Sequence, residues 1–453
     1  MSTPDRARLA ALTAREQDTF AARTPKSAAA HAAAGSLFGR VPMTWMNKTA
    51  AGYPVYAAGA RGARVTDVDG HEYVDFCLGD TGAMAGHSPA PVVAAVTRRL
   101  ADVGGAATML PTADAAVAGA ELSRRFGLPL WSFALTATDA NRWAIRLLRA
   151  VTGRPRILVN SYCYHGSVDE SLIVIGADGR PRSREGNVGA PCDVTLTSRV
   201  AEFNDLDGLD RELAHGDVAA VLMEPALTNI GIVLPEPGYL DGVRELTRRH
   251  GSYLINDETH TFSAGPGGAT AAWGLSPDVV TIGKAIGGGV PVGAYGLSAE
   301  LADRLTGRAD LDLIDMGGVG GTLAGNPVSM AATRATLSEV LTDAAFARMT
   351  ETATAFATGL RKIIAGYRLP WSVAQLGARV EYRFASPAPR TGTGSAASAD
   401  AELADFLHLY LLNRGILLTP FHNMALMSPV TTVDDVTRHH EVFDAALGEL
   451  VNA

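Results

Sequence analysis

The chain has 453 residues, of which 47% are hydrophobic and 19% charged, and its net charge is −8. This length is sufficient for a large buried core and exceeds that of one small domain, so we expect two or three lobes. A protein that binds nucleic acid usually has an excess of basic residues, and this chain has an acidic excess instead. Three widely spaced cysteines, Cys77, Cys163 and Cys192, indicate neither a disulfide framework nor a zinc site.

The N-terminal region carries Asp5, Glu16 and Asp18, and no apolar run in the chain reaches about 18 residues. These features predict neither a signal peptide nor a membrane-spanning helix. Together with the cysteine usage, they favour a cytoplasmic enzyme without a membrane or nucleic-acid partner.

In chain order, residues 1–34 are rich in Ala and Arg and predict a helical arm. Residues 55–77 predict a meander of short strands, with a hairpin turn at Asp69-Gly70. From about residue 91 onward, amphipathic helices alternate with short apolar runs. This alternation is typical of a parallel sheet covered by helices on both faces, and therefore of an α/β domain.

After about residue 335 the pattern becomes rich in helices, with one strand at 380–385 and a polar loop at 385–400. Two further helices are predicted at 401–415 and 433–451. We therefore expect a large domain and a smaller α+β domain built from both termini. The predicted boundaries are 1–97 for the N-terminal arm and part of the small domain, 98–335 for the large domain, and 336–453 for the rest of the small domain.

Lys284 is one of only four lysines, and it stands between a strand-like run and a glycine-rich turn in DVVTIGKAIGGG, residues 278–289. In open α/β sheets, ligands bind at the carboxyl ends of the strands. A partly desolvated lysine there loses proton affinity and becomes a nucleophile toward an aldehyde. The alternative is a structural lysine whose ammonium group reaches the solvent from the strand end.

Asp257 ends the apolar run SYLIND, residues 252–257, and lies one helix and one strand before Lys284. Two neighbouring strands would then present an acid and an amine to one crevice. An aspartate that keeps a pyridine nitrogen protonated, with a lysine that forms an imine, is the arrangement that pyridoxal phosphate requires. The alternative for Asp257 is a helix cap.

The surrounding sequence, residues 255–296 from INDETH to GAYG, resembles the signature of class III, fold-type I pyridoxal-phosphate aminotransferases. The resemblance is to the branch with glutamate-1-semialdehyde aminomutase and β-amino acid aminotransferases, and it extends from about residue 40 to 437. Further matching segments are residues 65–89, residues 136–154, the Tyr-His-Gly at 164–166, residues 221–240 with Glu-Pro-x-x-x-Asn, and residues 320–332 with Gly-Thr and Asn-Pro.

The resemblance implies pyridoxal 5'-phosphate as cofactor, with Lys284 as the Schiff base lysine and a homodimer whose subunits share active sites. It assigns the cofactor phosphate to the segment Thr136-Ala137-Thr138, and the partner's phosphate to Thr322. Around the ring it places Tyr164 on one face, Thr259 on the other, and His260, Glu224 and Asn229 on the phenolic side.

A physical reading supports the phosphate site, because the N-terminus of a helix offers unpaired N–H groups and a positive dipole end. The alternative is an ordinary Thr/Asp helix N-cap, and one segment can serve both as a cap and as a phosphate site. Ala137 departs from the family, which usually has glycine at this position, and its Cβ limits the approach of the backbone.

The segment expected to contact the substrate also departs from the family, because the aminomutase branch has an aromatic Ser-Trp-Gly element where this chain has Asp80-Thr81-Gly82. An acidic Asp80 would repel a substrate carboxylate or attract an amine. Arg379 and Arg383 are candidate carboxylate partners, with surface arginines as the alternative, and His422 is a candidate pocket residue.

We therefore expect an aminotransferase that moves an amino group from an amine or amino acid to a keto acid or aldehyde by a ping-pong mechanism. The alternative is an aminomutase of the glutamate-1-semialdehyde type, or an amino acid epimerase, on the same cofactor.

Overall fold

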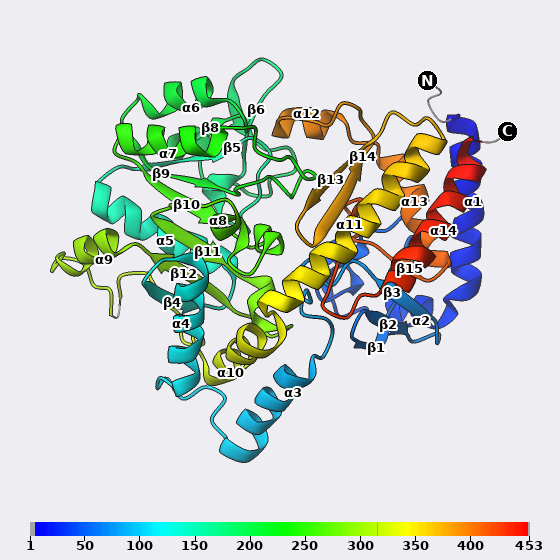
Figure 1. Ribbon diagram of the computed structural model, residues 1–453, viewed down its shortest axis with the longest axis horizontal. Helices are drawn as coiled ribbons and strands as arrows, with labels where there is room; N and C mark the ends of the chain where they lie inside the picture. The colour runs from blue at the N-terminus through cyan, green and yellow to red at the C-terminus, as the bar shows by residue number, and fades with distance from the viewer. Residues whose placement is uncertain (1–4, 315, 452–453) are drawn as a thin grey trace. The chain divides into compact units, whose positions relative to one another are not determined.

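The computed structural model describes residues 5–314 and 316–451, and its helices and strands form two compact units (Figure 1). The larger unit contains Pro89–Ala347 and Pro389–Ala397. The smaller unit contains the described residues of Met1–Ser88, Arg348–Ala388 and Ser398–Ala453, so both ends of the chain belong to it.

A seven-stranded sheet forms the centre of the larger unit. Its order is β4 (Leu130–Ala134), β12 (Gly293–Leu297), β11 (Val279–Ile282), β10 (Tyr253–Asp257), β9 (Val218–Met223), β5 (Arg156–Asn160) and β8 (Ser198–Ala201). β12 is antiparallel to both of its neighbours, whereas all other pairs are parallel. Every residue of β9, β10 and β11 is buried, as expected for strands with helices on both faces.

Helix α5 (Ala137–Thr152) packs along β9, β11 and β12 of this sheet. The other helices of the larger unit are α3 (Ala90–Thr97), α4 (Ala113–Phe126), α6 (Leu206–Leu213), α7 (Tyr239–Arg249), α8 (Gly268–Ala272), α9 (Ala299–Thr306), α10 (Pro327–Ala335) and α12 (Gly392–Ala397). A short hairpin, β6 (Ile173–Ile175) and β7 (Pro181–Ser183), is attached to them.

The smaller unit combines two sheets with long helices, which is an α+β arrangement. One sheet has the order β1 (Ala57–Arg61), β2 (Arg64–Asp67), β3 (Glu72–Asp75) and β15 (Ile416–Leu417), and the other has the order β13 (Ser372–Leu376), β14 (Arg379–Arg383) and β16 (Met424–Leu426). The helices are α1 (Arg6–Arg23), α2 (Pro25–Ala33), α11 (Asp343–Gly366, which begins in the larger unit), α13 (Ala401–Asn413) and α14 (Val433–Val451).

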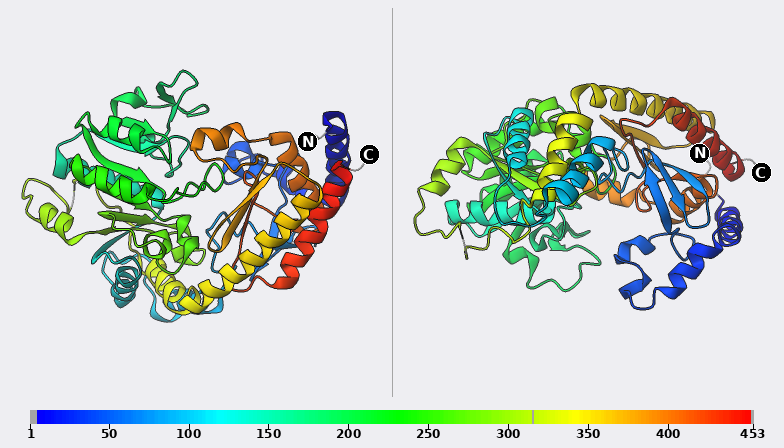
Figure 2. Two further views of the ribbon diagram at one scale, coloured as in Figure 1. Left: turned by 45° about the horizontal axis from the view of Figure 1, so that its top comes forward. Right: turned by 90° about the horizontal axis from the view of Figure 1, so that it is seen from below.

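The first and last helices of the chain lie side by side in this unit (Figure 2). Arg15 of α1 forms an ion pair of 2.6 Å with Glu449 of α14. α1 also packs along α13. The helical arm predicted for residues 1–34 is therefore two helices, α1 and α2, and the second begins with a proline at its first position, where the missing N–H costs nothing.

Two other expectations differ in detail from the structure. The units divide after Ser88 and after Ala347, because α3 packs on α10 and so belongs with the larger unit. The predicted polar loop at 385–400 contains a short helix, α12, which is part of the larger unit. None of the helices in the described part of the chain combines the length and apolar character needed to cross a bilayer.

Candidate active site

Asp257 and Lys284 lie at the same edge of the large sheet. Asp257 is the last residue of β10, and its register partner on the parallel neighbour β11 is Thr281. Lys284 follows β11 after one glycine and has a left-handed backbone, with φ of 47°. The acid and the amine therefore emerge from adjacent carboxyl ends of parallel strands, as the sequence predicts.

The carboxylate of Asp257 is buried and accepts three hydrogen bonds. Oδ2 accepts from the side-chain amide of Asn141 at 2.9 Å and contacts Nδ1 of His165 at 2.8 Å, and Oδ1 accepts from the backbone N–H of Thr259 at 3.0 Å. Burial alone would raise the pKa of Asp257, but the contact with His165 and the other hydrogen bonds lower it to about 2. Asp257 is therefore a firmly held anion.

His165 completes this cluster from the segment after β5. Burial opposes its charged form, but the nearby Cys163 and the hydrogen bond to Asp257 raise the pKa of His165 well above its usual range. Asn141 is held in turn, because its Oδ1 accepts from the Thr281 hydroxyl at 2.6 Å. A cationic group placed against the carboxylate of Asp257 would thus meet a fixed negative charge.

Lys284 is half-buried and leads into a second polar cluster. Its Nζ lies 2.5 Å from Nε2 of His260, whose Nδ1 lies 2.7 Å from the hydroxyl of Thr228. That hydroxyl also hydrogen-bonds the carboxyl group of Glu224, and Asn229 donates to the other carboxyl oxygen at 3.3 Å. Burial raises the pKa of Glu224, which favours a proton on its carboxyl group.

The N-terminus of α5 closely approaches Gly283, the residue before Lys284, and two further glycines also leave room for it. A Cβ at Gly293 would lie 2.3 Å from the carbonyl oxygen of Thr136, and one at Gly283 would lie 2.9 Å from the nitrogen of Ala137. A Cβ at Gly166 would lie 2.0 Å from the Thr138 hydroxyl. The methyl group of Ala137 is therefore accommodated by glycines opposite it.

These features fit pyridoxal phosphate. The first turn of α5 begins at Ala137, and its N–H groups and positive dipole end suit a phosphate. Lys284 supplies an amine for the aldehyde, and Asp257 supplies the anion for a protonated ring nitrogen. Each group comes from the larger unit, so this unit alone carries the chemical requirements of the cofactor.

Three other predicted cofactor residues also belong to the larger unit. Tyr164 is 44% exposed, and its carbonyl accepts from the amide of Asn229 at 3.4 Å. Thr259 is half-buried, and its hydroxyl has no hydrogen-bond partner among the residues that the structure describes. Thr322 is exposed and follows the glycine-rich segment 317–321. Both Tyr164 and Thr322 therefore have surface available to a ligand or a second chain.

The predicted substrate residues Asp80, Thr81, Arg383 and His422 all belong to the smaller unit. Asp80 and Thr81 have left-handed backbones, with φ of 49° and 82°. His422 is buried and lies 3.5 Å from the carboxylate of Glu381.

The arginines of β14 are not surface residues on a strand edge. Arg379 is fully buried and donates to the hydroxyl of Thr81. Arg383 is half-buried and donates to Ser398 at 3.1 Å. The surface alternative is therefore wrong, because β14 is the central strand of its sheet and its side chains pack inside the unit.

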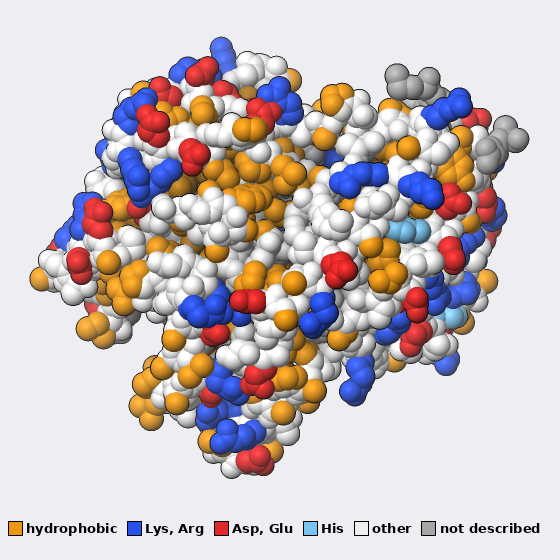
Figure 3. Space-filling view, in the orientation of Figure 1, with side chains coloured by type: hydrophobic (Ala, Val, Ile, Leu, Met, Phe, Trp, Pro, Cys, Tyr) orange, Lys and Arg blue, Asp and Glu red, His pale blue; other side chains and the backbone are white. Residues whose placement is uncertain are grey.

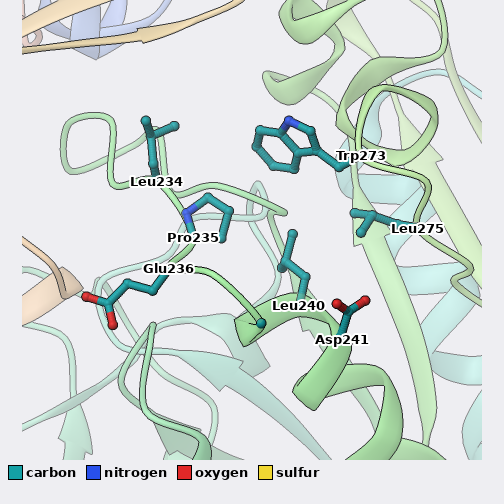
Figure 4. A pocket seen from close by; sticks show the side chains of 8 residues that line it. Leu234, Pro235, Glu236, Leu240, Asp241, Trp273 and Leu275 are labelled. Carbon is teal, nitrogen blue, oxygen red and sulfur yellow. The ribbon is translucent and has the colours of Figure 1, made fainter.

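A groove of about 320 Å³ lies elsewhere on the larger unit (Figure 4). It is lined by Leu234, Pro235, Glu236, Gly238, Leu240, Asp241, Trp273 and Leu275. The groove shares no residue with the Asp257 and Lys284 clusters. We therefore assign the candidate active site from the chemistry of those clusters and not from the groove.

Sequence reasoning missed three residues of these clusters. Asn141 and Thr228 carry no local signal, since each matters only through a partner distant in the sequence. His165 stands inside the Tyr-His-Gly segment, where its neighbour Tyr164 was the predicted contact. A histidine in that segment was the one available sign of a partner for Asp257.

A mostly parallel sheet with a lysine and an aspartate at adjacent strand ends, facing a helix N-terminus, defines a pyridoxal-phosphate enzyme of fold type I. The sequence profile of the family described as aminotransferase class-III matches residues 46–449. The chain belongs to this family.

Individual relatives carry two kinds of name. A glutamate-1-semialdehyde aminomutase from Pseudomonas aeruginosa, solved in complex with PMP, is 46% identical with a TM-score of 0.95, and the match covers 99% of each chain. A glutamate-1-semialdehyde 2,1-aminomutase from Anaeromyxobacter dehalogenans is 33% identical over 86% of this chain and 90% of its own length. An omega-transaminase from Sphaerobacter thermophilus is 32% identical with a TM-score of 0.84, over 94% of this chain and 97% of the other.

Proposed function

We propose that the protein is an aminotransferase that moves an amino group from an amine or amino acid donor to a keto acid or aldehyde acceptor. The observation that carries this proposal is the placement of the Lys284 amine and the Asp257 carboxylate at the ends of adjacent strands. Bound pyridoxal phosphate supplies an aldehyde that exchanges amines and a ring that takes up electron density.

The protein's own residues supply binding and proton transfer. Lys284 acts as nucleophile and then carries a proton to and from the reacting carbon. Asp257 holds the ring nitrogen proton, with Asn141 and His165 keeping its carboxylate in place. The N-terminus of α5, with Thr136, Ala137 and Thr138, binds the phosphate.

The remaining cofactor contacts are proposed by analogy with the family. Tyr164 and Thr259 pack against the two faces of the ring, and Glu224, Asn229 and His260 border its phenolic side. Asp80, Thr81, Arg383 and His422 select the substrate.

We also propose that the protein is a homodimer in which Thr322 contacts the partner's phosphate. Exposed apolar side chains support an interface, since large exposed patches mark association sites. Ile314 is 99% exposed and Met316 83% exposed, close in sequence to Thr322. Hydrophobic side chains also gather over α3 and the segment after it (Figure 3), where Leu100, Val103, Met109 and Leu110 are exposed.

An aminomutase is the second candidate, because the 46% identical structural relative and the 33% identical curated relative are named as aminomutases. An epimerase would use the same residues. Both reactions return the amino group to the molecule that supplied it, whereas an aminotransferase releases a keto product.

A spectroscopic experiment separates these reactions. Stoichiometric donor and enzyme are mixed without an acceptor, and the cofactor spectrum is followed. Lasting conversion to the pyridoxamine form, reversed by a keto acid or aldehyde, is expected for the aminotransferase. Repeated conversion of one compound into its isomer, with no acceptor present, would establish the mutase or epimerase instead.

A further inference from the structure

A continuous row of hydrogen bonds joins the amine of Lys284 to a buried carboxyl group. It runs from Lys284 Nζ to His260 Nε2 at 2.5 Å, from His260 Nδ1 to the Thr228 hydroxyl at 2.7 Å, and from that hydroxyl to Glu224. The side chains follow the carboxyl ends of three neighbouring strands, β9, β10 and β11. The row thus crosses the sheet edge at which the cofactor would bind.

Each member of the row can reverse its direction. When Glu224 is ionised, Thr228 donates to it, accepts from Nδ1–H of His260, and leaves Nε2 to accept from the Lys284 ammonium group. When Glu224 is protonated, it donates to Thr228, Thr228 donates to Nδ1, and Nε2–H donates to the neutral amine. Both arrangements contain the same number of protons.

We propose that Glu224, Thr228 and His260 form a proton relay that takes a proton from the Lys284 ammonium group to Glu224 and returns it. In one direction Lys284 gives a proton to Nε2, Nδ1 gives one to the Thr228 oxygen, and the Thr228 hydroxyl gives one to Glu224. The amine becomes neutral, the carboxylate becomes a carboxylic acid, and no proton enters from water. The inference rests on the proposed function, in which Lys284 is the nucleophile.

The surroundings of Glu224 suit a proton acceptor. Its carboxyl group is almost fully buried, and burial raises the pKa of Glu224, which favours the protonated form of the carboxyl group. Asn229 and the backbone N–H of Thr228 keep it in position, at 3.3 and 3.5 Å from Oε1. A nucleophilic lysine must be neutral, so a nearby internal acceptor favours the reactive form.

Thr228 provides the sharpest test, because valine has the shape of threonine without the hydroxyl. The apoprotein is mixed with pyridoxal phosphate, samples are reduced with borohydride at intervals, and mass spectrometry measures attachment at Lys284. We expect Thr228→Val to slow attachment about tenfold or more, and Thr228→Ser to stay close to the wild-type rate. Equal rates for the valine variant and the wild type would overturn the relay.

Glu224→Gln has a matched control in Glu258→Gln. Glu258 is equally buried, but it accepts from Thr261 and from the backbone of Ala269 and Thr270, outside the relay. We expect Glu224→Gln to slow attachment as Thr228→Val does and Glu258→Gln to leave the rate within about twofold. Equal slowing in both glutamine variants would show that the loss of any buried ionisable carboxyl group has this effect, and it would contradict the relay.

A second measurement needs no cofactor. The apoprotein is treated with limiting acetic anhydride, and labelling of Lys284 is compared with that of Lys26, Lys48 and Lys362. We expect Thr228→Val to lower the relative labelling of Lys284 severalfold, because less of its amine is neutral; unchanged labelling would reject the relay. If the wild type never binds the cofactor at Lys284, the proposed function fails, whatever the labelling result.

Discussion

Lys284 differs from the other lysines in its surroundings. It is half-buried, has a left-handed backbone, and contacts His260 through Nζ. A lysine that merely reached the solvent from a strand end would not need a partner at 2.5 Å. The contact favours a chemical role for Lys284. Single substitutions of Lys284 and of Asp257 test the site directly.

Lys284→Ala should still bind pyridoxal phosphate through the phosphate and ring contacts, but should lose covalent attachment. Turnover should fall by about a thousandfold or more, because nucleophile and proton carrier are removed together. Borohydride reduction followed by peptide mass spectrometry checks this, with Lys362→Ala as the control. A label on Lys48 or Lys362 in the wild type would overturn the assignment.

Asp257→Asn should remove the fixed negative charge and lower kcat by about 10² to 10³. It should also affect stability, because the pKa of Asp257 in the folded protein is about 2 against an ordinary 3.8. A pKa that is lowered in the folded protein stabilises the fold at pH values above the ordinary pKa, and this contribution is lost as the pH falls toward 2. At neutral pH the lowered pKa of Asp257 contributes about 2 kcal/mol to the free energy of unfolding.

Urea unfolding of the two apoproteins measures this contribution. The wild type should exceed Asp257→Asn by about 2 kcal/mol at pH 7, and the gap should narrow by pH 3. A gap that stays constant between these pH values would show that lost hydrogen bonds, rather than charge, cause the difference.

Among the elements, the N-terminus of α5 depends on glycines that come from other strands. Gly293 begins β12, and a Cβ there would meet the carbonyl carbon and oxygen of Thr136 at 2.4 and 2.3 Å. These are backbone atoms that cannot rotate away. The proposed phosphate site is therefore shaped by the close approach of β12 as well as by the helix itself.

Gly293→Ala should displace the first turn of α5 and destabilise the protein by about 1–3 kcal/mol. Cofactor affinity should fall about tenfold or more, because the N–H groups proposed to bind the phosphate move. Gly119→Ala is the control, since it lies in α4 with nothing within 4 Å of an added Cβ. Equilibrium dialysis and thermal unfolding compare the two; equal affinities would place the phosphate elsewhere.

At the scale of the whole molecule, the proposed homodimer predicts that Thr322 of one subunit contacts the cofactor phosphate in the partner's site. Thr322→Ala should weaken cofactor retention severalfold without unfolding the subunit, because the residue is exposed and outside the core. Gel filtration of the cofactor-loaded variant, followed by absorbance of the retained cofactor, measures the loss.

Mixing Thr322→Ala with Lys284→Ala subunits sharpens this test. In a hybrid dimer with shared sites, one site carries both lesions and the other carries neither, so partial activity should return. If subunit exchange is demonstrated and no activity returns, Thr322 acts within its own subunit.

Periodicity and local motifs were sufficient to predict the α/β class, the mostly parallel sheet and the positions of Lys284 and Asp257. A strand that is buried on both faces appears as a continuous apolar run, and the residue at its end is therefore visible in the sequence. For the same reason, the helix N-terminus at residues 136–138 could be predicted from a threonine cap before an amphipathic segment.

The partners of those residues were decided by tertiary structure alone. Asn141 and His165 contact Asp257 although they lie 116 and 92 residues before it in the sequence. Arg379 contacts Thr81 across a sequence separation of 298 residues. No local pattern encodes such contacts, because they depend on strand order and on which helix packs over which strand. The row from Lys284 to Glu224 exists for the same physical reason, since only the parallel alignment of β9, β10 and β11 brings their ends together.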